Sequence, residues 1–114
     1  MKFKFEKLLI WQDAMKLGKD INIIADSFPP EEMYNLSSQI RQAADSVALN
    51  IAEGSIGQSN PEQIKFIGYS IRSLAETVTC LHKAKLRNYI SENDSQINYD
   101  FSYKLMNMLI SFKT

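Results

Sequence analysis

The sequence has few of the residues that form covalent cross-links or bind metals. Its 114 residues include one cysteine, Cys80, so no internal disulfide can form, which fits a reducing compartment. A single histidine, His82, and the lack of a cysteine pair leave no ligand set for zinc. His82 also has Thr79 where di-iron bundles have the glutamate of a Glu-x-x-His pair. We therefore expect neither a metal nor another cofactor.

Net charge and long hydrophobic runs are also absent. Thirteen basic residues balance 13 acidic ones, whereas proteins that bind duplex nucleic acid usually carry a basic excess. The amino-terminal stretch MKFKFEKLLIWQD lacks the apolar run of about 7–15 residues found in signal peptides. No stretch approaches the roughly 18 apolar residues that span a bilayer. These absences predict a cytoplasmic protein that does not enter a membrane.

Glycine and proline are scarce, and the places where they cluster mark breaks between helices. Four glycines and three prolines occur, mostly in residues 28–30 and 54–61. Apolar residues recur at steps of three or four before each break: Trp11, Ala14, Leu17, Ile21, Ile24 and Phe28, then Leu36, Ile40, Ala43, Val47 and Ile51. This spacing predicts a helix over about residues 8–27 and a second that ends at Gly54.

Two further helices follow. The third is predicted to begin with Asn60 as its N-cap and Pro61 at the first helical position, and to end near residue 88 or 89. Residues 91–95 are polar and predict a turn. The apolar stripes are Ile64, Ile67, Ile71, Leu74, Val78 and Leu81, then Ile97, Phe101, Leu105, Met108 and Phe112.

Four amphipathic helices with short connections predict an all-α fold, an antiparallel up-down-up-down four-helix bundle. The length allows one domain, residues 1–114. We expect the core to include Leu36, Ile40, Val47, Ile51, Ile71, Leu74 and Val78.

A polar stripe lies beside the apolar arc of the second helix. At about 100° per residue, its members fall within roughly 60° of one another. They are Gln39, Ser46, Asn50 and Glu53. One interpretation is a set of hydrogen bonds that fixes helix register and caps the helix end. The alternative is a ligand or RNA site.

The third helix carries a second stripe, more than roughly 100° away from its apolar stripe. Its members are Phe66, Tyr69, Ser73, Cys80 and Ala84. Two buried faces are implied, which either contact two neighbours inside the bundle or include a contact with another subunit. Ala44, Ala48 and Ala52 on the second helix leave space for a close helix approach.

Basic residues gather near the amino terminus. Within the first nineteen residues, only Glu6 and Asp13 oppose five lysines: Lys2, Lys4, Lys7, Lys16 and Lys19. They form either a solvated face or a local basic patch for nucleic acid.

Catalytic motifs are missing. Residues 54–59 contain two glycines but lack the lysine of a phosphate-binding loop, and they follow a helix instead of a strand. Nine residues separate Arg72 from His82, so the pair does not match the spacing of helical ribonucleases. The remaining catalytic alternative is acid-base chemistry by Asn50, Glu53 and Glu76. We expect no enzyme.

Several motifs resemble a known family, the bacterial four-helix-bundle proteins encoded by intervening sequences in large-subunit ribosomal RNA genes. The matching segments are Leu8-x-x-Trp11-Gln12-x-Ala14, Phe28-Pro29, Ser73-x-x-Glu76 and Gln39-Ile40-Arg41-x-Ala43-Ala44-x-Ser46-Val47-x-x-Asn50-Ile51-Ala52-Glu53-Gly54. The resemblance implies a ring-shaped homopentamer without established enzymatic activity. A related branch is similar to the accessory protein of diversity-generating retroelements, which binds a reverse transcriptase and nucleic acid through a basic surface.

Two functional hypotheses follow. The first is a noncatalytic homo-oligomeric module, pentameric according to the resemblance, with Phe66, Tyr69, Ser73, Cys80 and Ala84 at the subunit interface and a protein or RNA partner. The second is binding of structured RNA by one face of the ring, with contacts from the five lysines and from Arg41 in the long motif.

Overall fold

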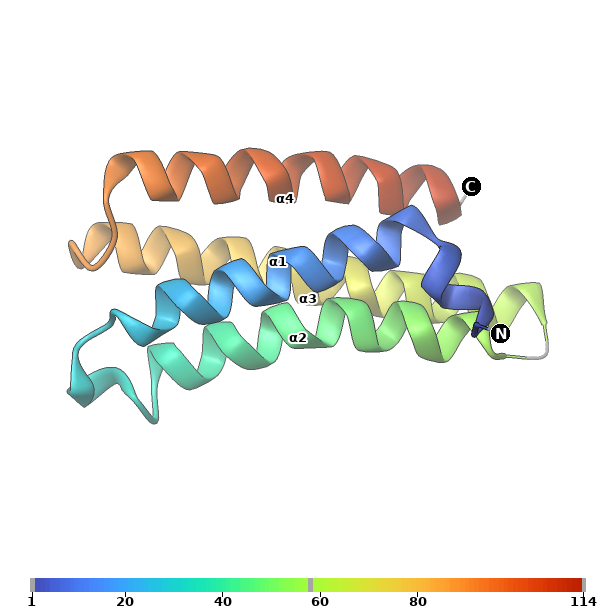
Figure 1. Ribbon diagram of the computed structural model, residues 1–114, viewed down its shortest axis with the longest axis horizontal. Coiled ribbons are helices and arrows are strands. Elements are labelled where there is room, and N and C mark those ends of the chain that lie inside the picture. Colours follow the sequence, from blue (N-terminus) through green and yellow to red (C-terminus); the bar gives the residue numbers. More distant parts are fainter. Residues whose placement is uncertain (1, 58, 114) are drawn as a thin grey trace.

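The computed structural model describes residues 2–57 and 59–113. Four long helices lie side by side along a body of 43 × 25 × 24 Å (Figure 1). The elements are η1 (Lys4–Lys7), α1 (Leu9–Asp26), η2 (Pro30–Glu32), α2 (Leu36–Ser55), α3 (Asn60–Leu86) and α4 (Glu92–Lys113). Consecutive helices run antiparallel, so the predicted all-α four-helix bundle is confirmed.

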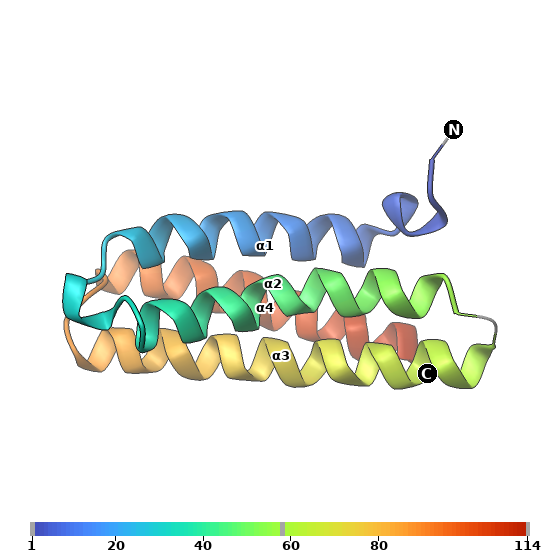
Figure 2. The ribbon, with the colours of Figure 1, turned by 90° about the horizontal axis from the view of Figure 1, so that it is seen from below.

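Each helix packs against two others. α1 contacts α2 and α4, and α3 contacts α2 and α4, with the most extensive contact between α2 and α3. The view turned by 90° shows α1 and α3 on opposite sides of the bundle, with α2 and α4 between them (Figure 2). Among the described residues, no helix has the length and hydrophobicity needed to cross a membrane.

Helix starts differ slightly from the prediction because serines cap them. Ser59, not Asn60, is the N-cap of α3, since its Oγ accepts a hydrogen bond from the Glu62 amide at 3.3 Å. The predicted turn at 91–95 is wrong after residue 91, because α4 already begins at Glu92. Ser91 Oγ accepts from the Asp94 amide at 3.0 Å, which satisfies a free amide of the first turn.

Gly54 does not end α2, contrary to the prediction, because the helix continues to Ser55. Its role lies in packing against α3. A Cβ atom at Gly54 would come within 2.8 Å of the Phe66 Cβ and 3.3 Å of the Gln63 carbonyl oxygen. The glycine therefore permits the close approach of the two helices.

The core draws on all four helices. Its largest fully buried side chains are Leu17, Ile21, Leu36, Ile40, Val47, Ile51, Ile67, Leu74, Thr77, Leu81, Leu105 and Leu109. The prediction of Leu36, Ile40, Val47, Ile51 and Leu74 as core residues is confirmed.

On two helices, the predicted apolar face is not the face that is buried. On α3, Ile71 and Val78 are only half-buried and Ile64 is exposed, because the helix turns its Ser70 and Thr77 side toward α2.

On α4, the predicted stripe members Ile97 and Phe112 are exposed, while Ser95, Asn98 and Ser102 are buried with Leu105 and Leu109. The small serine side chains lie where α4 meets its neighbours, and the larger residues beside them face outward. Packing between helices overrides the sequence period here.

Candidate functional site

The polar stripe of α2 makes hydrogen bonds within its own helix. Ser46 Oγ donates to the Gln42 carbonyl at 2.8 Å, and Asn50 Nδ2 donates to the Ser46 carbonyl at 2.9 Å. Gln39, Ser46 and Asn50 are half-buried, and Glu53 is exposed. Glu76 of α3, the remaining member of the motif set, is also exposed.

A different residue links α2 to α3. Ser70 is fully buried, and its Oγ donates to the Val47 carbonyl at 2.9 Å. Sequence reasoning missed this bond, because Ser70 lay outside both stripes of the third helix.

Two of the five members of the second stripe of α3 lie inside the bundle. Cys80 and Ala84 are fully buried inside the bundle, so the structure places both in the core and not at an interface between copies. Burial raises the pKa of the Cys80 thiol. Phe66 and Ser73 are half-buried and Tyr69 is 37% exposed, and the Phe66 and Tyr69 rings meet edge to face at 5.4 Å.

The five amino-terminal lysines and Arg41 do not form one continuous basic patch, because some of them are paired with acidic residues. Lys16 pairs with Asp20 at 2.7 Å and lies 4.9 Å from the centre of the Phe101 ring of α4. Arg41 pairs with Asp26. Lys2, Lys4, Lys7 and Lys19 are exposed and make no ion pair within the described part of the chain.

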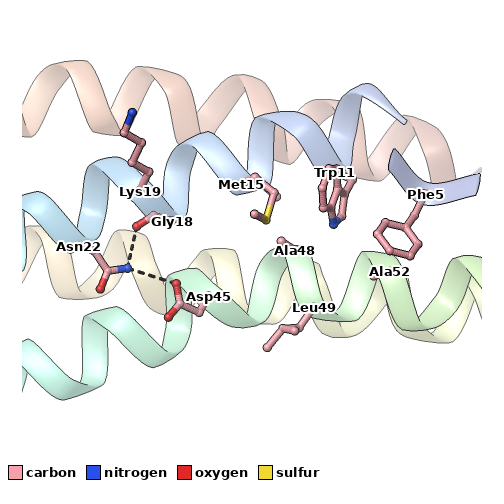
Figure 3. A pocket seen from close by; sticks show the side chains of 11 residues that line it. Phe5, Trp11, Met15, Gly18, Lys19, Asn22, Asp45, Ala48, Leu49 and Ala52 are labelled. Carbon is pink, nitrogen blue, oxygen red and sulfur yellow. Dashed lines mark hydrogen bonds between the residues drawn. The ribbon is translucent and has the colours of Figure 1, made fainter. Parts of the chain in front are cut away.

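A largely apolar groove of about 610 Å³ lies between α1 and α2, and we call it the α1/α2 groove (Figure 3). It is lined by Phe5, Trp11, Ala14, Met15, Gly18, Lys19, Asn22, Asp45, Ala48, Leu49 and Ala52. Met15 is 51% and Leu49 61% exposed. The alanines noted in the sequence supply part of the lining, but the contribution of Phe5 and Trp11 was not predicted.

Aromatic and polar groups occupy different parts of the groove. The rings of Phe5 and Trp11 lie 5.2 Å apart near its η1 side (Figure 3). Farther along, Asn22 Nδ2 donates to the Gly18 carbonyl at 2.8 Å and to Asp45 Oδ1 at 3.2 Å. A Cβ at Gly18 would lie 3.3 Å from the same Asp45 oxygen, so the glycine keeps the helices close. Such a groove suits a partner that brings apolar side chains and one hydrogen-bond donor, from which the Asp45 carboxylate can accept.

Catalytic groups do not gather in the described structure. Asn50, Glu53 and Glu76 make no hydrogen bond with one another, and none of the three lines the α1/α2 groove. In residues 2–57 and 59–113, no group of three or more His, Cys, Asp or Glu side chains is placed to hold a metal.

A buried carboxylate, which the sequence did not reveal, joins two loops at one end of the bundle. Glu32 is 7% exposed and accepts four hydrogen bonds. Arg87 Nη1 donates at 2.9 Å, Tyr89 Oη at 2.7 Å, Asn35 Nδ2 at 3.0 Å and the Leu36 amide at 3.3 Å. The network ties η2 to the connection between α3 and α4.

Glu32 is expected to make stability depend on acid pH. The hydrogen bond from Tyr89, with help from Leu36, Arg87 and Asn35, lowers the pKa of Glu32 although burial opposes this. Its stabilising contribution is therefore complete above the unfolded pKa of about 4.3 and is lost as pH falls through the lower folded pKa.

Glu32→Gln should consequently lower the urea midpoint at neutral pH. Its difference from the wild type should stay the same between about pH 7 and pH 5 and should shrink as pH falls from about 5 to 2, because the wild type loses the charged network only below the unfolded pKa of Glu32. Glu31→Gln, at the exposed neighbouring position, is the control and should show no such convergence. A constant difference for Glu32→Gln across this range would contradict the prediction.

Comparisons with known proteins agree with the motifs. A family model described as 23S rRNA-intervening sequence protein matches residues 6–111. A similar solved structure is that of a protein with unknown function from the S23 ribosomal protein family of Bacteroides thetaiotaomicron. It has a TM-score of 0.84 and 19% identity, and the match covers 93% of this chain and 99% of that chain. No curated protein matches. Since the family model spans most of its length, the chain belongs to the 23S rRNA-intervening sequence protein family.

Proposed function

We propose that this protein is a noncatalytic homo-oligomeric module, most simply a pentameric ring, that presents a surface to a partner. The observation that carries the proposal is the α1/α2 groove, an apolar hollow bordered by the exposed side chains of Met15 and Leu49. Isolated exposed apolar residues are common on monomers, whereas a contiguous apolar hollow marks an interaction site.

The balance of charges also supports assembly. With 13 basic and 13 acidic residues, the chain carries no net charge to keep copies apart. The polar stripe is partly exposed, and the hydrogen bonds of Ser46 and Asn50 stay within α2, so Gln39 and Glu53 are available to face a partner of the assembly.

RNA binding is the second candidate function. It is favoured by Lys2, Lys4 and Lys7, which are exposed around the short helix η1 without an ion pair in the described structure. A ring would bring several copies of this segment together, so contacts that are weak in one chain would add up.

One experiment tests both functions. Light scattering of the purified protein at micromolar concentration should give a mass several times that of the 13.1 kDa chain. A monomer would contradict the proposed function. The measurement is repeated with ribosomal RNA fragments at low and moderate salt, where RNA binding requires a complex that weakens as salt rises. A complex that ignores salt, or none at low salt, would reject the RNA candidate.

A further inference from the structure

A second apolar surface lies across the bundle from the α1/α2 groove. We call it the α3/α4 face. It contains a hollow of about 250 Å³ lined by Ala75, Val78, Tyr99, Ser102, Tyr103 and Met106. α1 contacts α2 and α3 contacts α4, while the pairs α2–α3 and α1–α4 close the bundle, so the two surfaces face opposite directions (Figure 2).

Aromatic side chains dominate the α3/α4 face. His82 meets Tyr99 at 5.9 Å between ring centres, and Tyr99 stacks on Tyr103 at 6.3 Å. Tyr103 is 61% exposed, and the same helix leaves Ile110 47% exposed. Exposed tyrosines of this kind are enriched where protein surfaces bind each other.

The two surfaces differ in shape. Gly18, Ala48 and Ala52 leave the α1/α2 groove open between its larger residues, whereas the α3/α4 face has a smaller hollow, about 250 Å³ against 610 Å³, and the Tyr103 ring beside it is 61% exposed. A contact in which both copies used the same surface would place two hollows or two sets of rings opposite each other. Bringing unlike surfaces together instead fits rings into a hollow.

Their polar groups are also complementary. The groove is lined by one acidic and one basic side chain, Asp45 and Lys19; the Asp45 carboxylate accepts a hydrogen bond from Asn22 and forms no ion pair among the described residues. No carboxylate lines the hollow of the α3/α4 face; the Tyr103 hydroxyl in its lining and the His82 ring beside Tyr99 can each donate a hydrogen bond. Asp45 lies near the middle of α2 and Tyr103 near the middle of α4, so both are at a similar level along the bundle.

We propose that the α3/α4 face of one copy docks into the α1/α2 groove of the next copy. This inference rests on the proposed homo-oligomeric function and adds the surfaces that form the contact. A head-to-tail contact between unlike surfaces leaves one groove and one face free at the ends of a growing assembly. Such contacts form a closed ring when the rotations between successive copies add up to a full turn, so that the last copy contacts the first.

Two variants test the contact. Leu49→Glu places a charge in the groove, and Tyr103→Glu places one on the α3/α4 face; both positions are 61% exposed, so folding should be unaffected. Each variant alone should be monomeric by light scattering. Mixed at equal concentration of about 100 μM, they should form a dimer and nothing larger, because only one intact groove and one intact face remain.

Matched controls are available at exposed positions outside both surfaces. Leu9 is 58% and Tyr34 92% exposed, and neither residue lines the groove or the hollow of the α3/α4 face, so Leu9→Glu and Tyr34→Glu make the same chemical changes elsewhere and should assemble as the wild type does. Helical circular dichroism with a cooperative melt verifies that every variant is folded.

The outcomes separate the two levels of the proposal. A monomeric wild type would overturn the proposed function and this inference together. An oligomeric wild type would leave the function standing, but the inference fails if either Leu49→Glu or Tyr103→Glu still assembles alone, or if their mixture stays monomeric. A loss of assembly in the control variants would likewise overturn the assignment of the two surfaces.

Discussion

Leu74→Ala is expected to lower the free energy of unfolding by about 2–5 kcal/mol, because truncation removes buried methyl groups and leaves a cavity. Leu74 is fully buried on α3, which packs against both α2 and α4. Urea unfolding followed by circular dichroism measures the loss. Protein concentration is held constant, because assembly adds to apparent stability.

Ile71→Ala is the matched comparison on the same helix. The sequence pattern assigned Ile71 and Leu74 to one core stripe, but Ile71 is only half-buried. Its truncation should therefore cost clearly less than that of Leu74. Equal losses at the two positions would show that the core does not have the orientation described for α3.

Gly54→Ala is expected to destabilise the protein by about 1–3 kcal/mol, although alanine is the better helix former by about 1 kcal/mol. The added methyl group would lie 2.8 Å from the Phe66 Cβ. That atom is fixed to the α3 backbone and cannot rotate away, so α2 and α3 would have to separate.

Gly68→Ala provides the control for Gly54→Ala. Gly68 is also inside a helix, but a Cβ there would have the flexible Lys113 Nζ at 3.9 Å as its nearest neighbour. The substitution should therefore stabilise the protein, by about 0.5–1 kcal/mol. Thermal or urea unfolding of both variants shows whether the signs are opposite; a stabilised Gly54→Ala would contradict the close approach of α2 and α3.

The helices were predictable because helix formation depends on nearby residues. The spacing of Leu17 and Ile21 matches the helical repeat, and the proline pair after Phe28 stops α1 at Asp26, within one residue of the predicted end. Starts were less predictable, since Ser59 and Asn60 are both good caps and only the geometry selects Ser59.

The candidate site was predicted only in part. The long motif drew attention to α2, and its alanines contribute to the α1/α2 groove. The other wall comes from Phe5, Trp11 and Met15. The spacing of apolar residues in the sequence does not show whether these three side chains face the core or the surface. The lysines were grouped by their closeness in sequence, but Lys16 lies against Phe101 and Arg41 pairs with Asp26.

By itself, the sequence determined that the chain forms four antiparallel helices and belongs to a particular family, because periodicity and motifs are properties of short segments. Tertiary structure alone decided that Gly54 serves helix packing, that Cys80 lies inside the bundle and that Glu32 meets Arg87 and Tyr89 across more than fifty residues. It also left the α1/α2 groove uncovered. These outcomes depend on how far each helix rotates and how closely it approaches its neighbours, and such distances are set by all four helices packing at once.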